Sequence, residues 1–187
     1  MTYAAASLGA ADVATMQLAL SIWTLLAFTL DALAIAAQTL VGHQLGRGDR
    51  EAVRSLTRTL TGWGAGLGAV TGALLLGCSW WIGHLFTSDP AVIDRLTPVL
   101  IVAALAQPVA GIVFTLDGIL IGAGDGRYLA VAQTIVLIAF ATLATWVMTG
   151  PATLTWLWAA FAVGFMGTRA ALLLARARGE AWMRLGA

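Results

Sequence analysis

Five apolar segments, each long enough to cross a lipid bilayer, recur along the 187-residue sequence. About 20 apolar residues in a helix span a hydrocarbon core of ~30 Å. Only 10% of the residues are charged, whereas a soluble domain is about 25% charged. The sequence therefore predicts an all-α fold, a polytopic membrane helix bundle, because helices satisfy their backbone hydrogen bonds internally within lipid. We expect spans at about 15–44, 60–82, 98–122, 129–149 and 152–175, preceded by 1–12 as the tail of a truncated helix.

The arginines fall almost entirely on one side of these spans. All ten basic residues are arginine, and nine lie after the first or third span or towards the end of the fifth. Arg95 alone lies on the opposite side, near Asp89 and Asp94. Cytoplasmic loops carry an excess of basic residues, so we expect a multi-pass protein of the cell (inner, cytoplasmic) membrane. In this prediction the N-terminus lies outside and the C-terminus in the cytoplasm.

Tryptophans gather near the ends of the predicted spans, as in the aromatic belts of membrane proteins. We expect interfacial side chains at Trp63, Trp80, Trp81, Trp146, Trp156, Trp158 and Trp182.

Asp31 is an acid placed inside the first apolar span. A carboxylate at a helix centre costs roughly 2.5–3.5 kcal/mol on insertion scales, and such residues usually mark ion or proton pathways. Gln17, Thr24, Asp31 and Gln38 recur every seven residues and so share one helix face. We expect this stripe to line the protein interior, with Asp31 binding a proton or cation. The alternative is a protonated Asp31 that holds helices together through a hydrogen bond.

The tetrapeptide FTLD occurs twice, at 28–31 and 114–117, and each copy precedes a GxGD turn. Asp31 lies fifteen residues before Gly46, about 22 Å of helix, whereas Asp117 lies five residues before Gly122, about 7 Å. This spacing predicts Asp31 near the membrane midplane and Asp117 near the inner surface. The two copies are therefore not expected to form equivalent sites.

Asp117 is a second candidate for the cation or substrate pathway, with water and Arg127 as its expected neighbours. Gln107 is a candidate cavity residue, and Pro108 next to it predicts a kink or hinge in the third span.

Small residues at four-residue spacing predict close helix packing in the second span, at Gly64, Gly68 and Gly72. Each GxGD, at 46–49 and 122–125, predicts a turn with a left-handed glycine and an aspartate N-cap for the next helix.

No group of side chains predicts catalysis or a bound cofactor or metal. The single cysteine, Cys78, cannot form an intrachain disulfide, and His43 and His84 fall at opposite membrane ends. We therefore expect a protein that is not an enzyme.

Two stretches resemble multidrug and toxin extrusion (MATE) transporters of the DinF-like branch. LDALAIAAQTLVGHQLGRGDREAV is similar to the eighth helix and following loop of that family, and FTLDGILIGAGDGRYL is similar to its tenth helix. The family's fold has twelve helices in two six-helix lobes. The resemblance implies that residues 1–187 are the C-terminal transmembrane lobe, an incomplete chain lacking the N-terminal lobe and its coupling aspartate.

The resemblance also implies a function. Family members export organic, often cationic, compounds across the cell membrane by antiport with H⁺ or Na⁺. The implied partners are a small organic substrate, the lipid membrane and the missing N-terminal lobe, with no nucleic acid and no cofactor beyond the coupling ion.

Two other functions remain open. A lipid or oligosaccharide flippase of the same broad superfamily would line its cavity with basic residues, and the expected position of every arginine near a membrane surface argues against it. A non-transporting membrane scaffold would pack against a partner protein through the glycine stripes.

Overall fold

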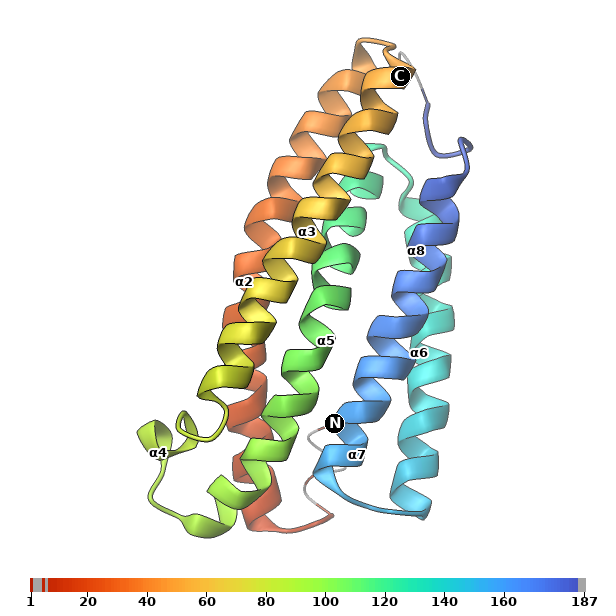
Figure 1. Ribbon diagram of the computed structural model, residues 1–187. Coiled ribbons are helices and arrows are strands. Elements are labelled where there is room, and N and C mark those ends of the chain that lie inside the picture. The colour runs from red at the N-terminus through yellow and green to blue at the C-terminus, as the bar shows by residue number, and fades with distance from the viewer. Residues whose placement is uncertain (2–4, 6, 185–187) are drawn as a thin grey trace.

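The chain folds into a bundle of long helices in a computed structural model that describes residues 1, 5 and 7–184. Five helices of the described part are long and apolar enough to cross a membrane, which confirms the predicted all-α membrane bundle. The last of the five consists of three consecutive segments, α7, η1 and α8 (Figure 1). The elements are α2 (Ala10–Gly46), α3 (Arg50–Cys78), the short α4 (Gly83–Phe86), α5 (Pro90–Gly122), α6 (Gly126–Thr149), α7 (Leu154–Ala160), η1 (Phe161–Gly167) and α8 (Thr168–Arg178). The predicted helix tail at 1–12 lies partly outside the described residues.

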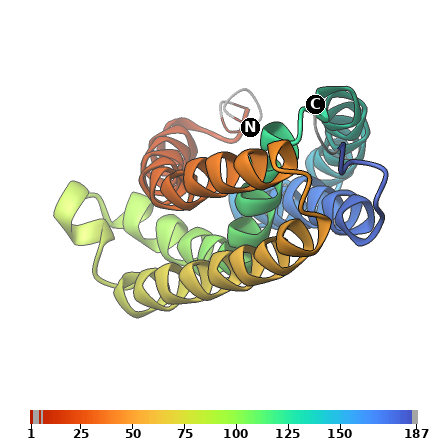
Figure 2. The same cartoon turned by 90° about the horizontal axis from the view of Figure 1, so that it is seen from above.

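Helix α5 occupies the centre of the bundle. It lies between α2 and α3 on one side and the C-terminal helix on the other (Figure 2). Sixteen residues of α5 are buried, against three of α6. Among its own side chains, Leu100, Leu116 and Ile119 are almost completely buried. The hydrophobic core of the lobe is therefore organised around α5.

The glycine stripe of α3 packs directly on α5, as predicted. A Cβ atom added at Gly64, Gly68 or Gly72 would lie less than 3 Å from a backbone carbonyl oxygen of α5. Those oxygens belong to Gly111, Gln107 and Ala104, in that order. Only a residue without a Cβ allows two helix backbones to approach this closely.

Helix α5 continues through Pro108 without interruption. Proline has no N–H to donate to the carbonyl oxygen four residues earlier, which here belongs to Ala104. Gly72 of α3 packs against that same oxygen. A hinge at Pro108 remains a prediction.

Helices α2 and α5 run parallel. Gly118 packs on the backbone of Ala34, and one turn further along Gly122 packs on the backbone of Gln38. Helix α2 continues for two more turns to Gly46, so α2 and α3 extend beyond the end of α5 at the top of Figure 1. These contacts fix the relative depth of every residue on the two helices.

Four helices, α2, α3, α5 and α6, begin earlier than the hydropathy pattern predicts, and the difference is largest for α3 and α5. Helix α3 begins at Arg50 because Asp49 caps it and accepts a hydrogen bond from the Ala52 N–H at 2.9 Å. Helix α5 begins at Pro90, where Asp89 accepts from the Ala91 N–H at 2.9 Å. The first turn of α3 is helical although its charged residues lie outside the apolar run from which the span was predicted.

The C-terminal helix contains a π-helical segment that the sequence analysis did not predict. This segment, η1, carries Phe161 and Phe165, whose rings stack with centroids 5.3 Å apart. Phe161 also meets Trp158 and Trp23 edge to face. Trp158 is therefore 1% exposed, so its predicted interfacial position is wrong.

Trp182 is a second correction, since it is buried and its indole N–H donates to the Gly179 carbonyl at 3.0 Å. The other predicted interfacial tryptophans are all exposed, namely Trp63, Trp80, Trp81, Trp146 and Trp156.

Candidate functional site

An ion pair joins Asp117 of α5 to Arg169 of α8. The guanidinium donates Nε and Nη2 hydrogen bonds to the two carboxylate oxygens, each at 2.8 Å. Arg169 also donates to the amide oxygen of Gln133 on α6. Three helices therefore meet at one polar cluster, which we call the α5–α6–α8 cluster (Asp117, Gln133 and Arg169).

The charged neighbour of Asp117 differs from the predicted one. Arg127, the predicted neighbour, is exposed, and Arg169, predicted near a membrane surface, forms the ion pair. Arg169 lies nine residues before the end of α8, about 13 Å of helix, and its side chain is largely buried. Arg169 thus lies within the bundle and not at the end of the last helix. The position of Arg169 well before the end of the last apolar segment could have indicated this in the sequence. No feature of the sequence indicated Gln133.

A second ion pair lies at the end of the bundle where α5 meets α6. Arg176 donates its Nε hydrogen bond to Asp125 at 2.7 Å, and its guanidinium carbon lies 4.8 Å from the centre of the Tyr128 ring. The Tyr128 hydroxyl donates to the Leu172 carbonyl at 2.7 Å. Asp125 makes no side-chain cap bond to α6, so its predicted N-cap role is wrong. Asp49 does cap α3, as predicted.

In each GxGD turn, the second glycine is the residue with a positive φ. Gly48 has φ 73° and Gly124 has φ 72°. The two turns are therefore alike in backbone and differ in how the aspartate is used.

The two FTLD acids lie at nearly the same depth, contrary to prediction. Ala34 pairs with Gly118 and Gln38 with Gly122, so residues 84 apart in sequence are level. Asp31 and Asp117 are 86 apart, which leaves about 3 Å along the helix axes. The prediction counted from the ends of α2 and α5, and these ends are not level because α2 extends further.

Asp31 differs from Asp117 in its partners. Its side chain is half-buried. Within the part of the chain that the structure describes, it has no hydrogen bond and no ion pair. Asp31 is thus a carboxyl group inside an apolar helix without a neutralising group among the described residues.

The stripe predicted around Asp31 lies on the outer face of α2. Gln17, Thr24 and Gln38 are exposed in this lobe, and their place along an ion or substrate pathway stays a prediction. The inner face of α2 is occupied instead by apolar side chains such as Met16 and Leu30. A shallow pocket of about 440 Å³ lies on the outer face and is lined by Gln17, Leu20, Ser21, Thr24, Leu25 and Phe28.

Gln107 is buried between α3 and α5. Its amide oxygen accepts a hydrogen bond from the Thr71 hydroxyl at 3.4 Å, and its backbone supports Gly68. The side chain belongs to a helix interface and not to a cavity, which corrects the expectation.

Five membrane-length helices, joined by a polar cluster and carrying a polar stripe on one exposed face, define a multi-pass membrane protein. Comparison with known protein families identifies the family of this membrane protein. The model of the MatE family matches residues 1–147, and the chain belongs to that family.

Known relatives support the same assignment. Protein DETOXIFICATION 45, chloroplastic, of Arabidopsis thaliana is 30% identical over 139 residues, covering 72% of this chain and 24% of that protein. Multidrug and toxin extrusion protein 1 of Homo sapiens is 29% identical over 101 residues, covering 54% and 18%. This chain thus spans about a quarter or less of the length of these relatives.

A solved structure shares the fold. The crystal structure of the eukaryotic MATE transporter AtDTX14 matches with a TM-score of 0.84 and 22% identity, covering 92% of this chain and 39% of that chain.

Proposed function

We propose that this chain acts as the C-terminal lobe of a cation-coupled exporter of organic, often cationic, compounds. Membership of the MatE family supports a transport function, and the printed names of the relatives refer to detoxification and to multidrug and toxin extrusion. H⁺ or Na⁺ is the proposed coupling ion. The proposed orientation in the cell membrane places the C-terminus in the cytoplasm, on the side of the arginine-rich turns.

The observation that carries this proposal is the contrast in partners between Asp31 and Asp117. A carboxylate within a membrane is costly unless it is neutralised or reaches water. Arg169 neutralises Asp117, whereas Asp31 has no such partner among the described residues. Asp31 is therefore the acid available to take up and release a proton or a sodium ion.

The position of Asp31 connects ion binding to substrate binding. It lies on the same face of α2 as the exposed stripe of Gln17, Thr24 and Gln38. We propose that this face lines the cleft between this lobe and the N-terminal lobe. A cationic substrate and the coupling ion would then compete for one carboxylate, which is the requirement for exchange.

Alternating access follows from this arrangement. In transporters built from two repeats, one lobe moves against the other around a fixed site. The α5–α6–α8 cluster and the glycine contacts between α3 and α5 support movement of the described lobe as a rigid unit.

The test is Asp31→Asn in the full-length protein, assayed by efflux of a fluorescent cation from cells. We expect efflux to fall at least tenfold while the amount of protein in the membrane is unchanged. Gln38→Leu and Thr24→Val are matched changes on the same face, and they should alter which substrates are exported more than the overall rate. Undiminished efflux by Asp31→Asn would refute the role of Asp31.

A further inference from the structure

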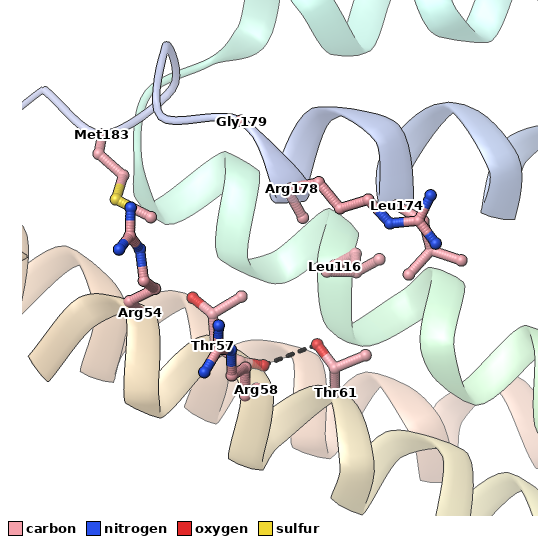
Figure 3. Close-up of a pocket in the computed structure, with 10 residues that line it drawn as sticks. Arg54, Thr57, Arg58, Thr61, Leu116, Leu174, Arg178, Gly179 and Met183 are labelled. Atoms are coloured by element: carbon pink, nitrogen blue, oxygen red, sulfur yellow. Dashed lines mark hydrogen bonds between the residues drawn. The ribbon is translucent and has the colours of Figure 1, made fainter. Parts of the chain in front are cut away.

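A pocket of about 420 Å³ lies between α3, α5, α8 and the segment after α8, away from the stripe on α2 (Figure 3). Its walls combine guanidinium groups, hydroxyl groups and aliphatic side chains. Among the residues that line it are Arg58, Arg178, Thr57, Thr61, Leu116 and Leu174.

Two guanidinium groups of this pocket are free to bind a ligand. Arg58 and Arg178 are exposed and have no ion pair or hydrogen bond to any residue that the structure describes. Arg54, which also lines the pocket, is held by Glu180. The pocket therefore presents two unpaired positive charges, from helices that are far apart in sequence.

The wall after α8 is fixed by its own contacts. The Glu180 carboxylate accepts a hydrogen bond from Arg50 at 2.8 Å and forms an ion pair with Arg54. Trp182 is buried, and its indole N–H bonds to the Gly179 carbonyl. The segment thus bridges from α8 to α3, and the pocket beneath it is part of the folded structure.

The other walls are apolar. Leu116 is buried at the base of the pocket, and Leu174 and Ala177 lie beside it. A ligand seated here would meet both positive charge and aliphatic side chains.

We propose that this pocket binds the phosphate headgroup of an anionic membrane lipid. Arginine binds phosphate oxygens through a planar fork of N–H groups, and basic pockets between membrane helices bind anionic headgroups. A second surface, lined by Arg50, Ser55 and Thr59 among others, adjoins it along α3 and gives room for a larger headgroup. A free phosphate ion would use the arginines but not the apolar wall, which is why the lipid is the favoured source of the phosphate.

Native mass spectrometry of the delipidated full chain tests this proposal. The protein is titrated with phosphatidylglycerol, with phosphatidylcholine and with inorganic phosphate. We expect phosphatidylglycerol to bind tightly at one site, phosphatidylcholine to bind at least tenfold more weakly, and inorganic phosphate not to compete at millimolar concentration.

The variant Arg58→Gln/Arg178→Gln should weaken the phosphatidylglycerol site about twenty-five-fold, since each arginine near a charged surface contributes a factor of about five. Both side chains are exposed, so the variant should fold, and its thermal unfolding is measured alongside. The matched control Arg47→Gln/Arg127→Gln removes two exposed arginines that do not line the pocket, one at the end of α2 and one at the start of α6, and should change the affinity less than twofold.

Equal affinity for the two lipids, or equal loss in both double variants, would overturn the proposal in favour of non-specific attraction. Competition by inorganic phosphate would identify a free-anion site in its place. Because the readout is lipid binding, failure of the export function at Asp31 would leave the result unaffected.

Discussion

The two FTLD segments have the same four residues and nearly the same depth, yet their acids lie in different environments. Asp117 lies on the central helix α5 and forms an ion pair with Arg169. Asp31 lies on the peripheral helix α2 and has no partner in the described part of the chain. The comparison shows that the helix packed behind an acid, and not its local sequence or depth, determines whether its charge is neutralised.

The largest effect is expected from removing the partner of Asp117. Breaking a buried ion pair by deleting one member costs about 3–5 kcal/mol because a charge is left uncompensated. Arg169→Met should therefore reduce the free energy of unfolding by about 3 kcal/mol, measured by titration with SDS in mixed micelles. The double variant Arg169→Met/Asp117→Leu removes both charges and should recover more than half of this loss. Equal losses in the two variants would show that the ion pair is not the cause.

The next effect concerns the contact that places the two acids at one level. A Cβ added at Gly118 would lie less than 3 Å from the Ala34 carbonyl oxygen, and neither backbone can yield easily. Gly118→Ala should cost about 2 kcal/mol, within the 1–3 kcal/mol typical of overpacking. The control is Gly66→Ala on α3, where a Cβ meets nothing within 4 Å. It should be neutral or stabilising by up to about 1 kcal/mol, and similar losses in both variants would contradict the packing described.

A smaller effect is expected at the second ion pair. Arg176 contacts Asp125 and the ring of Tyr128 at the end of the bundle, where water is close. Arg176→Gln should lower the free energy of unfolding by about 1 kcal/mol, combining a partly exposed ion pair and a cation–π contact. High salt should reduce the difference between variant and parent, and an effect as large as that of Arg169→Met would contradict the ranking.

The smallest effect on stability is expected at Asp31. Because it has no partner to lose, Asp31→Asn should change the free energy of unfolding by less than about 0.5 kcal/mol. The same SDS titration measures it. A loss of 2 kcal/mol or more would show that Asp31 holds helices together and would remove the contrast with Asp117.

Much of the fold follows from local patterns in the sequence. The five spans, the close packing at Gly64, Gly68 and Gly72, and the cap at Asp49 each depend on local rules of length, side-chain size or hydrogen bonding. Such rules act over a few turns of helix, so one sequence is enough to apply them.

The failures concern relations between distant helices. The depth of Asp117 relative to Asp31 depends on how far α2 extends past α5, which the contact of Gly118 with Ala34 establishes. The partner Arg169 is 52 residues away in sequence. The π-helical segment begins at Phe161, which packs in an aromatic cluster with Trp158 and, from a distant helix, Trp23. None of these contacts leaves a periodic pattern in the chain.

The central claim is that Asp31 faces a water-accessible cleft in the full-length protein. Its most direct test is the reaction of Asp31→Cys with a charged methanethiosulfonate reagent, in a Cys78→Ala background that removes the native thiol. Leu74→Cys, on an exposed apolar face of α3, is the control for a position in lipid. We predict that position 31 is modified at least tenfold faster than position 74 and that an exported cation slows the reaction. Modification of position 31 as slow as that of position 74 would place Asp31 in lipid and contradict the account.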